Sequence, residues 1–273
     1  MTRFSKYAVP FCAVLIAVVV GGCGKAGGSP TPSPISDPST LITQSGLAVT
    51  SVQTIHFEMT LDGSIKTAAL GSSAAGLGGS IKLNGATISG DLDIAHQAYH
   101  LNMSMPSLMG LTADVIQVDG SQYTKVSLQS DKYTKSKGAD FGAVASAAPV
   151  ASADVAKTIT QIKSALDSAG VTATISGTEK VDGRDAYRLS VSMPVAKINS
   201  LLEAAVGSAA SGITIDSASL DYWVYKDTLQ PAKMELSGTS AAVGNIDLVL
   251  TLTKYNEKVT IVAPSADQIQ TAQ

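Results

Sequence analysis

Apolar and polar residues alternate with a period of two along most of the chain after residue 53. In residues 54–66, every second side chain from Ile55 to Leu61 is apolar and those between are polar. This alternation is typical of a strand with one face toward a core and the other toward solvent. Similar stretches predict further strands at residues 80–94, 98–105, 111–118, 121–128, 172–181, 184–194, 218–226, 232–238 and 245–255.

Asp-Gly pairs separate two pairs of these stretches. Asp119 and Gly120 form one pair, and Asp182 and Gly183 form the other. Both central residues of the tightest hairpin turns need a positive φ, so an Asp-Gly pair between alternating stretches indicates a two-residue hairpin. The sequence therefore predicts that these neighbouring strands pair antiparallel.

Three other stretches repeat apolar residues every three or four positions, as helices do. Residues 38–49 predict a short amphipathic helix docked on the domain. Residues 152–170 start at Ser152, a suitable N-cap, and residues 194–207 start at Pro194. Many antiparallel strands with two or three helices predict an α+β fold, a strongly curved antiparallel sheet with helices packed across its concave face.

The start of the chain has the features of an export signal. Basic residues precede an apolar run at residues 7–20, which is shorter than the about 20 residues that span a bilayer. The following VGGC stretch resembles a bacterial lipobox, in which the cysteine is acylated and becomes the new N-terminus. We therefore expect a signal peptide at residues 1–22 and lipidation of Cys23. The alternative is a generic signal peptide followed by a cysteine that has no such role.

The segment after Cys23 differs from the rest of the chain. Residues 23–38 are rich in Gly, Pro and Ser without apolar periodicity, and predict a flexible tether. Residues 39–273 are predicted to form a single domain, which is long enough to bury a core. Cys12 leaves with the signal and Cys23 would carry lipid, so the mature chain has no thiol pair for a disulfide or metal site.

The charge balance bears on possible partners. The chain has 19 basic and 22 acidic residues, and removal of the signal takes away two basic residues and no acidic ones. Nucleic-acid binding needs clustered Lys and Arg, so no nucleic-acid partner is expected. The chain also has no polybasic patch for anionic lipids. We expect acyl chains on Cys23 to anchor the exported protein at the outer face of the cell membrane.

Motifs that would indicate catalysis or a cofactor are missing from the sequence. Residues 96–100, HQAYH, resemble a zinc-protease pattern, but that pattern needs a helix and a glutamate where Gln97 stands. His56 lies on the polar face of its predicted strand and has no cysteine partner. Asp91 and Asp93 share a face of another predicted strand, and we expect them to be solvated carboxylates and not a catalytic dyad. No nucleophile elbow, P-loop or dinucleotide motif occurs. We expect no metal and no cofactor, and an enzyme is the third hypothesis.

The apolar composition suggests a cavity. The chain has one Trp and four Phe but abundant small residues, so a curved sheet of aliphatic side chains could leave an apolar cavity for a ligand. A filled core is the alternative. Three nearly uncharged stretches, at residues 68–80, 103–111 and 138–152, are either flexible connections or a lip that the ligand crosses. The sequence leaves both interpretations of these stretches, flexible connection and ligand lip, open.

Several segments together resemble one family. They are the lipobox, the Pro/Ser tether, the hairpin GTEKVDGRDAYRLSVSMP with its following INSLL helix, and the late stretch WVYKDTLQPAKMEL. In pattern and order the chain resembles the mycobacterial LppX/LprA/LprF/LprG lipoproteins. The resemblance implies a half-barrel sheet with helices across its open side, akin to the LolA and LolB carriers, and an apolar cavity for acylated lipids.

The leading hypothesis is a membrane-anchored lipoprotein that binds acyl lipids or lipoglycans and carries them across the cell envelope, with an envelope transporter as a candidate partner. A non-carrier interaction module with a filled core is the alternative. The residues expected to line the cavity are Phe57, Met59, Leu61, Leu92, Ile94, Leu101 and Met103 from the sheet and Val155, Ile159, Ile162, Leu166, Ile198, Leu201 and Leu202 from the helices.

Overall fold

The computed structural model describes residues 35–67, 79–138, 170–199, 214–242 and 244–270. The predicted signal peptide, Cys23 and most of the tether lie outside these residues. So does nearly all of the predicted helix at 152–170, together with the larger part of the predicted helix at 194–207. Only the first turn of the latter is described, as helical residues 195–199, in which the Ile198 amide donates to the Pro194 carbonyl.

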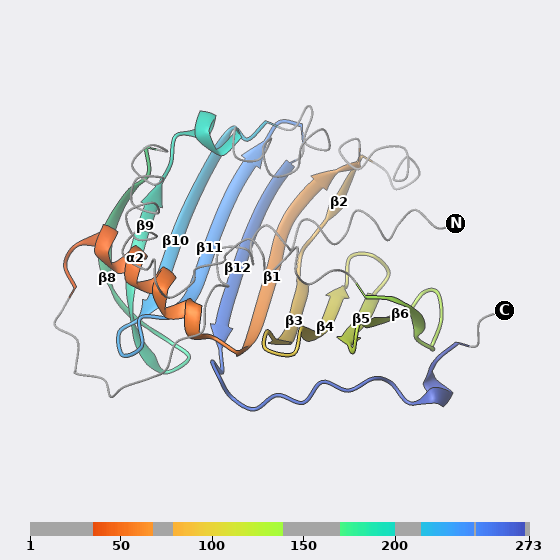
Figure 1. Ribbon diagram of the computed structural model, residues 1–273. Helices are drawn as coiled ribbons and strands as arrows, with labels where there is room; N and C mark the ends of the chain where they lie inside the picture. Colours follow the sequence, from red (N-terminus) through yellow and green to blue (C-terminus); the bar gives the residue numbers. More distant parts are fainter. Residues whose placement is uncertain (1–34, 68–78, 139–169, 200–213, 243, 271–273) are drawn as a thin grey trace. The chain divides into compact units, whose positions relative to one another are not determined.

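The described residues form a large, open, antiparallel sheet (Figure 1). Its twelve strands are β1 (Thr54–Lys66), β2 (Ser80–Lys82), β3 (Ala86–Asp93), β4 (Ala98–Met105), β5 (Leu111–Val118), β6 (Ser121–Val126), β7 (Thr134–Lys137), β8 (Thr172–Val181), β9 (Arg184–Ser192), β10 (Ser217–Tyr225), β11 (Pro231–Ser240) and β12 (Gly244–Thr253). The strand order is β7-β6-β5-β4-β3-β1-β12-β11-β10-β9-β8, and β2 pairs with β1. This arrangement confirms the predicted antiparallel fold class.

The chain groups into two compact units. Unit 1 comprises Met1–Val52 with Gly142–Lys233, and unit 2 comprises Gln53–Phe141 with Met234–Gln273. The assignment of residues 39–273 to a single domain stays a prediction. Each unit is described in turn.

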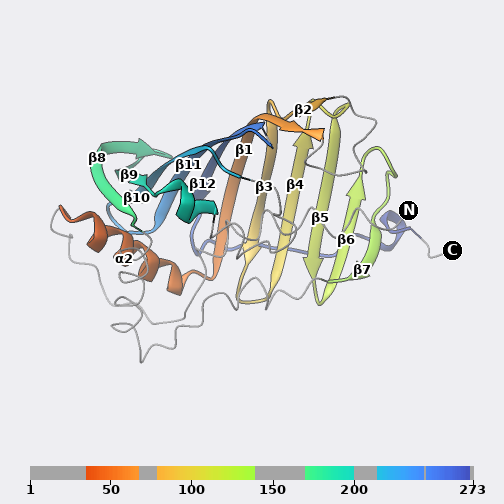
Figure 2. The same ribbon diagram turned by 90° about the horizontal axis from the view of Figure 1, so that it is seen from above.

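In unit 1, the helix α2 (Pro38–Ala48) packs on strands β8–β10 (Figure 2). Its N-cap is Asp37, whose carboxylate accepts hydrogen bonds from Thr40 and Ser39. These bonds stabilise the ionised carboxylate and lower the pKa of Asp37 to about 2. Leu41 is completely buried against the strands, which confirms the predicted docked helix. A 3-10 turn, η2 (Val49–Ser51), ends the helical segment.

The two Asp-Gly pairs form the predicted hairpin turns. Asp119 and Gly120 have φ values of 50° and 68°, and they connect β5 to β6. Asp182 and Gly183 have φ values of 49° and 76°, and they connect β8 to β9. Positive φ at both central residues is the geometry of the two-residue turn that Asp-Gly favours.

The predicted strand at 80–94 is wrong in its continuity, because the chain turns within it. Gly85 has a φ of 72°, a left-handed conformation that interrupts a strand, and its amide donates to the Asp62 carboxylate at 3.0 Å. The segment therefore divides into β2 and β3, which both pair with β1. Strand β7 was not predicted, because its TKSK sequence has no alternation; it is held by its backbone pairing with β6.

In unit 2, residues 254–270 follow β12 as an extended segment that ends near the 3-10 turn η6 (Ala266–Gln268) (Figure 1). The Asn256 amide donates to the Thr54 carbonyl at 2.9 Å, and the Tyr133 amide donates to the Gln268 carbonyl at 2.8 Å. Ile261 and Ile269 pack on a cluster of three buried residues, namely Ile116 of β5, Tyr123 of β6 and Tyr133, which precedes β7. The C-terminal segment thus covers part of the sheet of unit 2.

Candidate functional site

The strand register of unit 2 brings one residue from each of five strands into a row of four apolar side chains and a glycine. Residues directly opposite each other in an antiparallel pair lie on the same face of the sheet. Phe57 of β1 lies opposite Leu252 of β12 on one side and Gly90 of β3 on the other. Gly90 in turn lies opposite Leu101 of β4, and Leu101 lies opposite Val115 of β5.

A second apolar row lies beside the first. Met59 of β1 pairs with Leu250 of β12 and with Ile88 of β3. Ile88 pairs with Met103 of β4, and Met103 pairs with Ala113 of β5. We call the side of the sheet that carries these two rows the apolar face of unit 2. The side chains in the two rows are apolar, so this part of the sheet favours contact with apolar groups.

Burial decreases along this face from its centre toward β5. Phe57, Met59 and Leu250 are buried, whereas Leu101, Met103 and Val115 are only half-buried. Apolar surface that is removed from water stabilises a complex by about 25 cal/mol per Å². An apolar ligand bound to the part of the apolar face on β4 and β5 would therefore remove further apolar surface from water and be stabilised by it.

Gly90 shapes this face. A Cβ atom at this position would lie 2.2 Å from the His100 carbonyl oxygen and 2.9 Å from Leu101 Cδ2. Both distances are far below van der Waals contact, so glycine is the residue that fits. The missing side chain gives Leu101 room beside the buried centre of the row.

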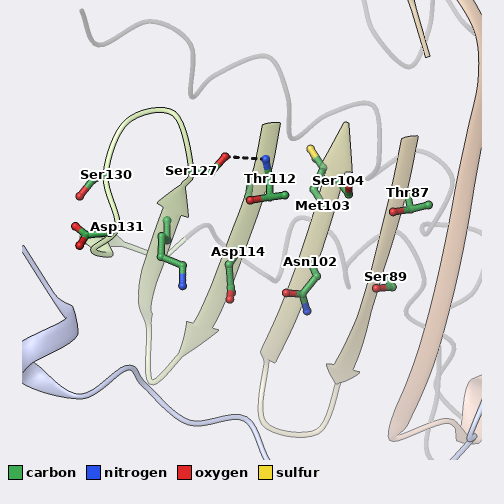
Figure 3. A pocket seen from close by; sticks show the side chains of 12 residues that line it. Thr87, Ser89, Asn102, Met103, Ser104, Thr112, Asp114, Ser127, Ser130 and Asp131 are labelled. Carbon is green, nitrogen blue, oxygen red and sulfur yellow. Dashed lines mark hydrogen bonds between the residues drawn. The ribbon is translucent and has the colours of Figure 1, made fainter. Parts of the chain in front are cut away.

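Outside the cluster of Ile116, Tyr123 and Tyr133, the opposite face of the same strands is largely polar, and it carries a groove of about 560 Å³ (Figure 3). Its polar lining residues are Thr87, Ser89, Asn102, Ser104, Thr112, Asp114, Lys125, Ser127, Ser130 and Asp131. Met103 and Ala113 complete the lining, so the groove presents polar and apolar atoms together. The groove is therefore chemically unlike the apolar cavity that the sequence predicts, which stays a prediction.

Two histidines on the polar face are paired with separate aspartates. His56 Nδ1 lies 2.8 Å from the Asp91 carboxylate, and His100 Nε2 lies 2.9 Å from the Asp114 carboxylate. Tyr133 donates a hydrogen bond of 2.9 Å to the same Asp114. Burial, followed by this bond and the negative charge of Asp114, raises the pKa of Tyr133 to about 12. The first pair links β1 to β3, and the second links β4 and β5 to the residue before β7.

The HQAYH stretch has the turn and strand geometry that the sequence predicts. Gln97 has a φ of 55° in the turn between β3 and β4, and His100 lies on β4. His96 contacts the Asp93 carboxylate at 2.8 Å, whereas His100 contacts Asp114. The zinc-protease pattern needs a helix, so it does not apply here. Within the described ranges, no group of three His, Cys, Asp or Glu residues could hold a metal ion.

In unit 1, a charged network covers buried aromatic side chains on the sheet face away from α2. Trp223 donates a hydrogen bond of 3.1 Å to Glu179, and the Arg188 guanidinium lies 5.1 Å from the Trp223 ring centre. Arg188 also pairs with Glu179 and Asp221, each at 2.9 Å. The hydrogen bonds from Arg188 and Ser190 lower the pKa of Asp221. This face is closed by its own side chains.

The family model described as LppX_LprAFG lipoprotein matches residues 37–261. The chain belongs to this family. The match confirms the resemblance that the sequence shows. Among solved structures, lipoprotein LppX of Mycobacterium tuberculosis is 16% identical, with 82% of this chain and 97% of that chain covered and a TM-score of 0.49. LprF of Mycobacterium bovis is 15% identical, with 87% and 100% covered and a TM-score of 0.49. None of the curated protein sequences matches the chain.

In this LppX_LprAFG lipoprotein, the described residues predicted to line the cavity lie largely together. The six on the apolar face of unit 2 are Phe57, Met59, Leu61, Leu92, Leu101 and Met103. Ile94 follows β3 and is half-buried, and its amide donates to the Gln53 carbonyl at 2.8 Å. Ile198 is half-buried in the helical turn of unit 1. The residues outside the described ranges are Val155, Ile159, Ile162, Leu166, Leu201 and Leu202.

Sequence reasoning missed several members of the apolar face. Ile88, Val115, Leu250 and Leu252 all lie in its two rows. Their alternation was visible, but it does not reveal which strands are neighbours. The pairing of β1 with β12 joins segments far apart in the chain, and only the register connects them.

Among the described helices, none is both long enough and apolar enough to cross a bilayer. This finding concerns residues 35–270 with their gaps.

Proposed function

We propose that this LppX_LprAFG lipoprotein binds the acyl chains of a lipid or lipoglycan on the apolar face of unit 2 and carries them across the cell envelope. The observation that supports the proposal is the half-buried state of Leu101, Met103 and Val115 at one side of two continuous apolar rows. Burial of an acyl chain along them would contribute about 0.8 kcal/mol of binding free energy for each methylene group. The mechanism is reversible binding, without covalent chemistry.

The proposal includes anchoring at the outer face of the cell membrane through acyl chains on Cys23. The lipobox-like sequence and the family's description as lipoproteins support this part. An envelope transporter that receives or supplies the lipid is the partner we propose. Substitution Cys23→Ala should leave an unprocessed precursor without labelled fatty acid, as measured by metabolic labelling. Undiminished labelling of the variant would exclude Cys23 as the anchor.

The direct test of the carrier role is the lipid content of the protein. The full chain is isolated from its native membrane and extracted with organic solvent, and the extract is quantified by mass spectrometry. Stoichiometric acyl lipid, beyond the chains attached to the protein, is the expected result. A protein without such lipid would favour the alternative, an interaction module whose core is filled.

Three tryptophan substitutions on one strand locate the binding surface. Leu101→Trp and Met103→Trp add volume to the apolar face, whereas Asn102→Trp places the same ring on the opposite, polar face of β4. The first two variants should lose most of the bound lipid because the added ring occupies its place, and Asn102→Trp should keep it. Equal loss in all three variants would contradict binding on the apolar face. Thermal unfolding confirms that each variant is folded.

A further inference from the structure

A short hairpin tip in unit 2 presents apolar side chains to solvent. The tip joins β4 to β5 at residues 106–110, and Met109 within it is 84% exposed. Leu128, in the loop that follows β6, is 55% exposed. Met109 is the most exposed large apolar residue in the part of the chain that the structure describes. Neighbouring apolar groups at such exposure indicate an interaction site more often than isolated ones do.

The conformation of the tip holds Met109 outward. The Leu108 amide donates to the Met105 carbonyl, and the Gly110 amide donates to the Pro106 carbonyl, each at 3.1 Å. Met109 has a φ of 56°, a left-handed conformation that is uncommon for residues other than Gly, Asn and Asp. Both solvent exposure and backbone conformation thus disfavour a methionine here. A contact made by its side chain would account for its presence.

The second exposed residue lies at the same end of the sheet. The Ser127 amide donates to the Thr112 carbonyl at 2.9 Å, and the Thr112 amide donates to Ser127 Oγ at 3.0 Å (Figure 3). These two bonds join the start of β5 to the loop that carries Leu128. We call Leu108, Met109 and Leu128 the apolar tip.

The surroundings of the apolar tip favour lipid over protein. Residues 103–111 and 126–130 contain no charged side chain, so the tip offers no ion pair to a protein partner. The Leu108 and Gly110 amides are already bonded within the hairpin, and these two therefore need no partner in an apolar phase. The hydroxyl of Ser107, in the same hairpin, donates a hydrogen bond to the Lys82 carbonyl. Lys82 is exposed and is suited to an anionic headgroup.

The apolar tip is continuous with the apolar face of unit 2. Met105, the last residue of β4, pairs with Leu111, the first residue of β5, and this pair lies next to Met103 and Ala113 on the same face. We propose that the apolar tip inserts into the interfacial region of a lipid bilayer, and that acyl chains pass across it between the bilayer and the apolar face. The insertion stands on the tip alone, whereas the passage of acyl chains rests on the proposed carrier function.

Tryptophan fluorescence provides the test of insertion. The only native tryptophan, Trp223, is 1% exposed, so it supplies a constant background. Met109→Trp is introduced into the full chain, which is mixed with vesicles of phosphatidylcholine and phosphatidylglycerol that carry bromine on their acyl chains. Interfacial side chains lie about 5–10 Å deep in the headgroup and acyl boundary, and bromine should therefore remove about half of the added emission.

Val262→Trp is the matched control. Val262 is 64% exposed on the C-terminal segment, next to Ile261, which packs beside Ile116 and Tyr123 near the opposite ends of β5 and β6. A ring at this position should keep its emission, because it remains in water when the tip is inserted. Equal quenching at positions 109 and 262 would overturn the proposal, since it would show that the bilayer contacts both ends of these strands equally.

Two further measurements keep the outcome decisive. Leu128→Trp replaces Met109→Trp if the latter does not fold, and absence of bromine quenching in a folded variant overturns the proposal. Shielding of the new ring from acrylamide without bromine quenching would indicate a protein partner and would also overturn it. Loss of emission to bromine in a protein that extracts without lipid would support insertion and refute only the carrier function.

The double variant Met109→Asp with Leu128→Asp should slow lipid transfer between vesicles about tenfold while bound lipid is kept.

Discussion

Two sheet faces of this protein are built from equally apolar strands but differ in what covers them. In unit 1, Leu189 of β9 and Val224 of β10 are completely buried because α2 places Leu41 on them. In unit 2, Leu101 of β4 and Val115 of β5 remain half-buried. Alternation along a strand therefore indicates which face is apolar, but not whether that face is part of a filled core or a surface for binding.

The difference originates in a short stretch of sequence before the first strand. Asp37 caps α2 and Pro38 occupies its first turn, so the helix begins at a defined residue. Ser45 of α2 also forms a hydrogen bond of 2.7 Å with the Tyr222 hydroxyl. These interactions fix α2 over strands of unit 1 and make that face a core.

The largest expected effect separates the two faces directly. Leu41→Ala should lower the free energy of unfolding by about 2–5 kcal/mol, since it leaves a cavity in a fully packed cluster. Leu101→Ala should cost about 1 kcal/mol, because its side chain is already partly in contact with solvent. Urea unfolding of both variants measures the difference. Equal losses would mean that the apolar face of unit 2 is a filled core too.

The next effect concerns Gly90 at the centre of the apolar face of unit 2. Gly90→Ala should destabilise the protein by about 1–3 kcal/mol, because its Cβ would meet the His100 carbonyl oxygen at 2.2 Å. Gly79→Ala is the control, since no atom lies within 4 Å of a Cβ there. Urea unfolding compares the two variants. A Gly90→Ala protein as stable as the control would show that the strands can separate at this point.

Local patterns predicted most of the strands correctly. The alternation at residues 54–66 and the Asp-Gly turns led to elements whose bounds or dihedral angles the structure reproduces. Strand β7 could not be predicted, because TKSK lacks a buried side and is held by backbone bonds to β6. The break at Gly85 was missed since a single glycine within alternating residues also occurs in continuous strands, as Gly90 does in β3.

The candidate site was predictable only in part, for a physical reason. Phe57 and Met103 could be assigned to apolar faces of their own strands from alternation alone. The row that Met103 shares with Leu250 and Ile88, and the neighbouring row of Phe57, depend on hydrogen-bond register between distant segments, which side-chain periodicity does not encode. The exposed Met109 was included in an uncharged stretch, but its outward position depends on a turn with positive φ.

The smallest expected effect appears only at alkaline pH and compares one tyrosine from each unit. The pKa of Tyr222 is raised to about 12 by burial, and that of Tyr133 is raised to about 12 by burial together with Asp114. In the unfolded chain both would ionise near the ordinary value of 10.0. The stability that each contributes is therefore fully present below pH 10 and is lost as the pH rises through about 12.

The aspartate distinguishes the two tyrosines. Asp114→Asn removes the negative charge beside Tyr133 and should lower the pKa of that tyrosine, because charge repulsion no longer opposes its ionisation. Within the described residues the hydrogen-bond partner of Tyr222 is the uncharged Ser45, so the pKa of Tyr222 should not change. Ultraviolet difference absorbance of tyrosinate measures both titrations, with Tyr133→Phe and Tyr222→Phe assigning the signals. An unchanged pKa of Tyr133 in Asp114→Asn would refute the role of Asp114, since burial alone would then set the pKa of both tyrosines. A changed pKa of Tyr222 would likewise refute the causes assigned to that tyrosine.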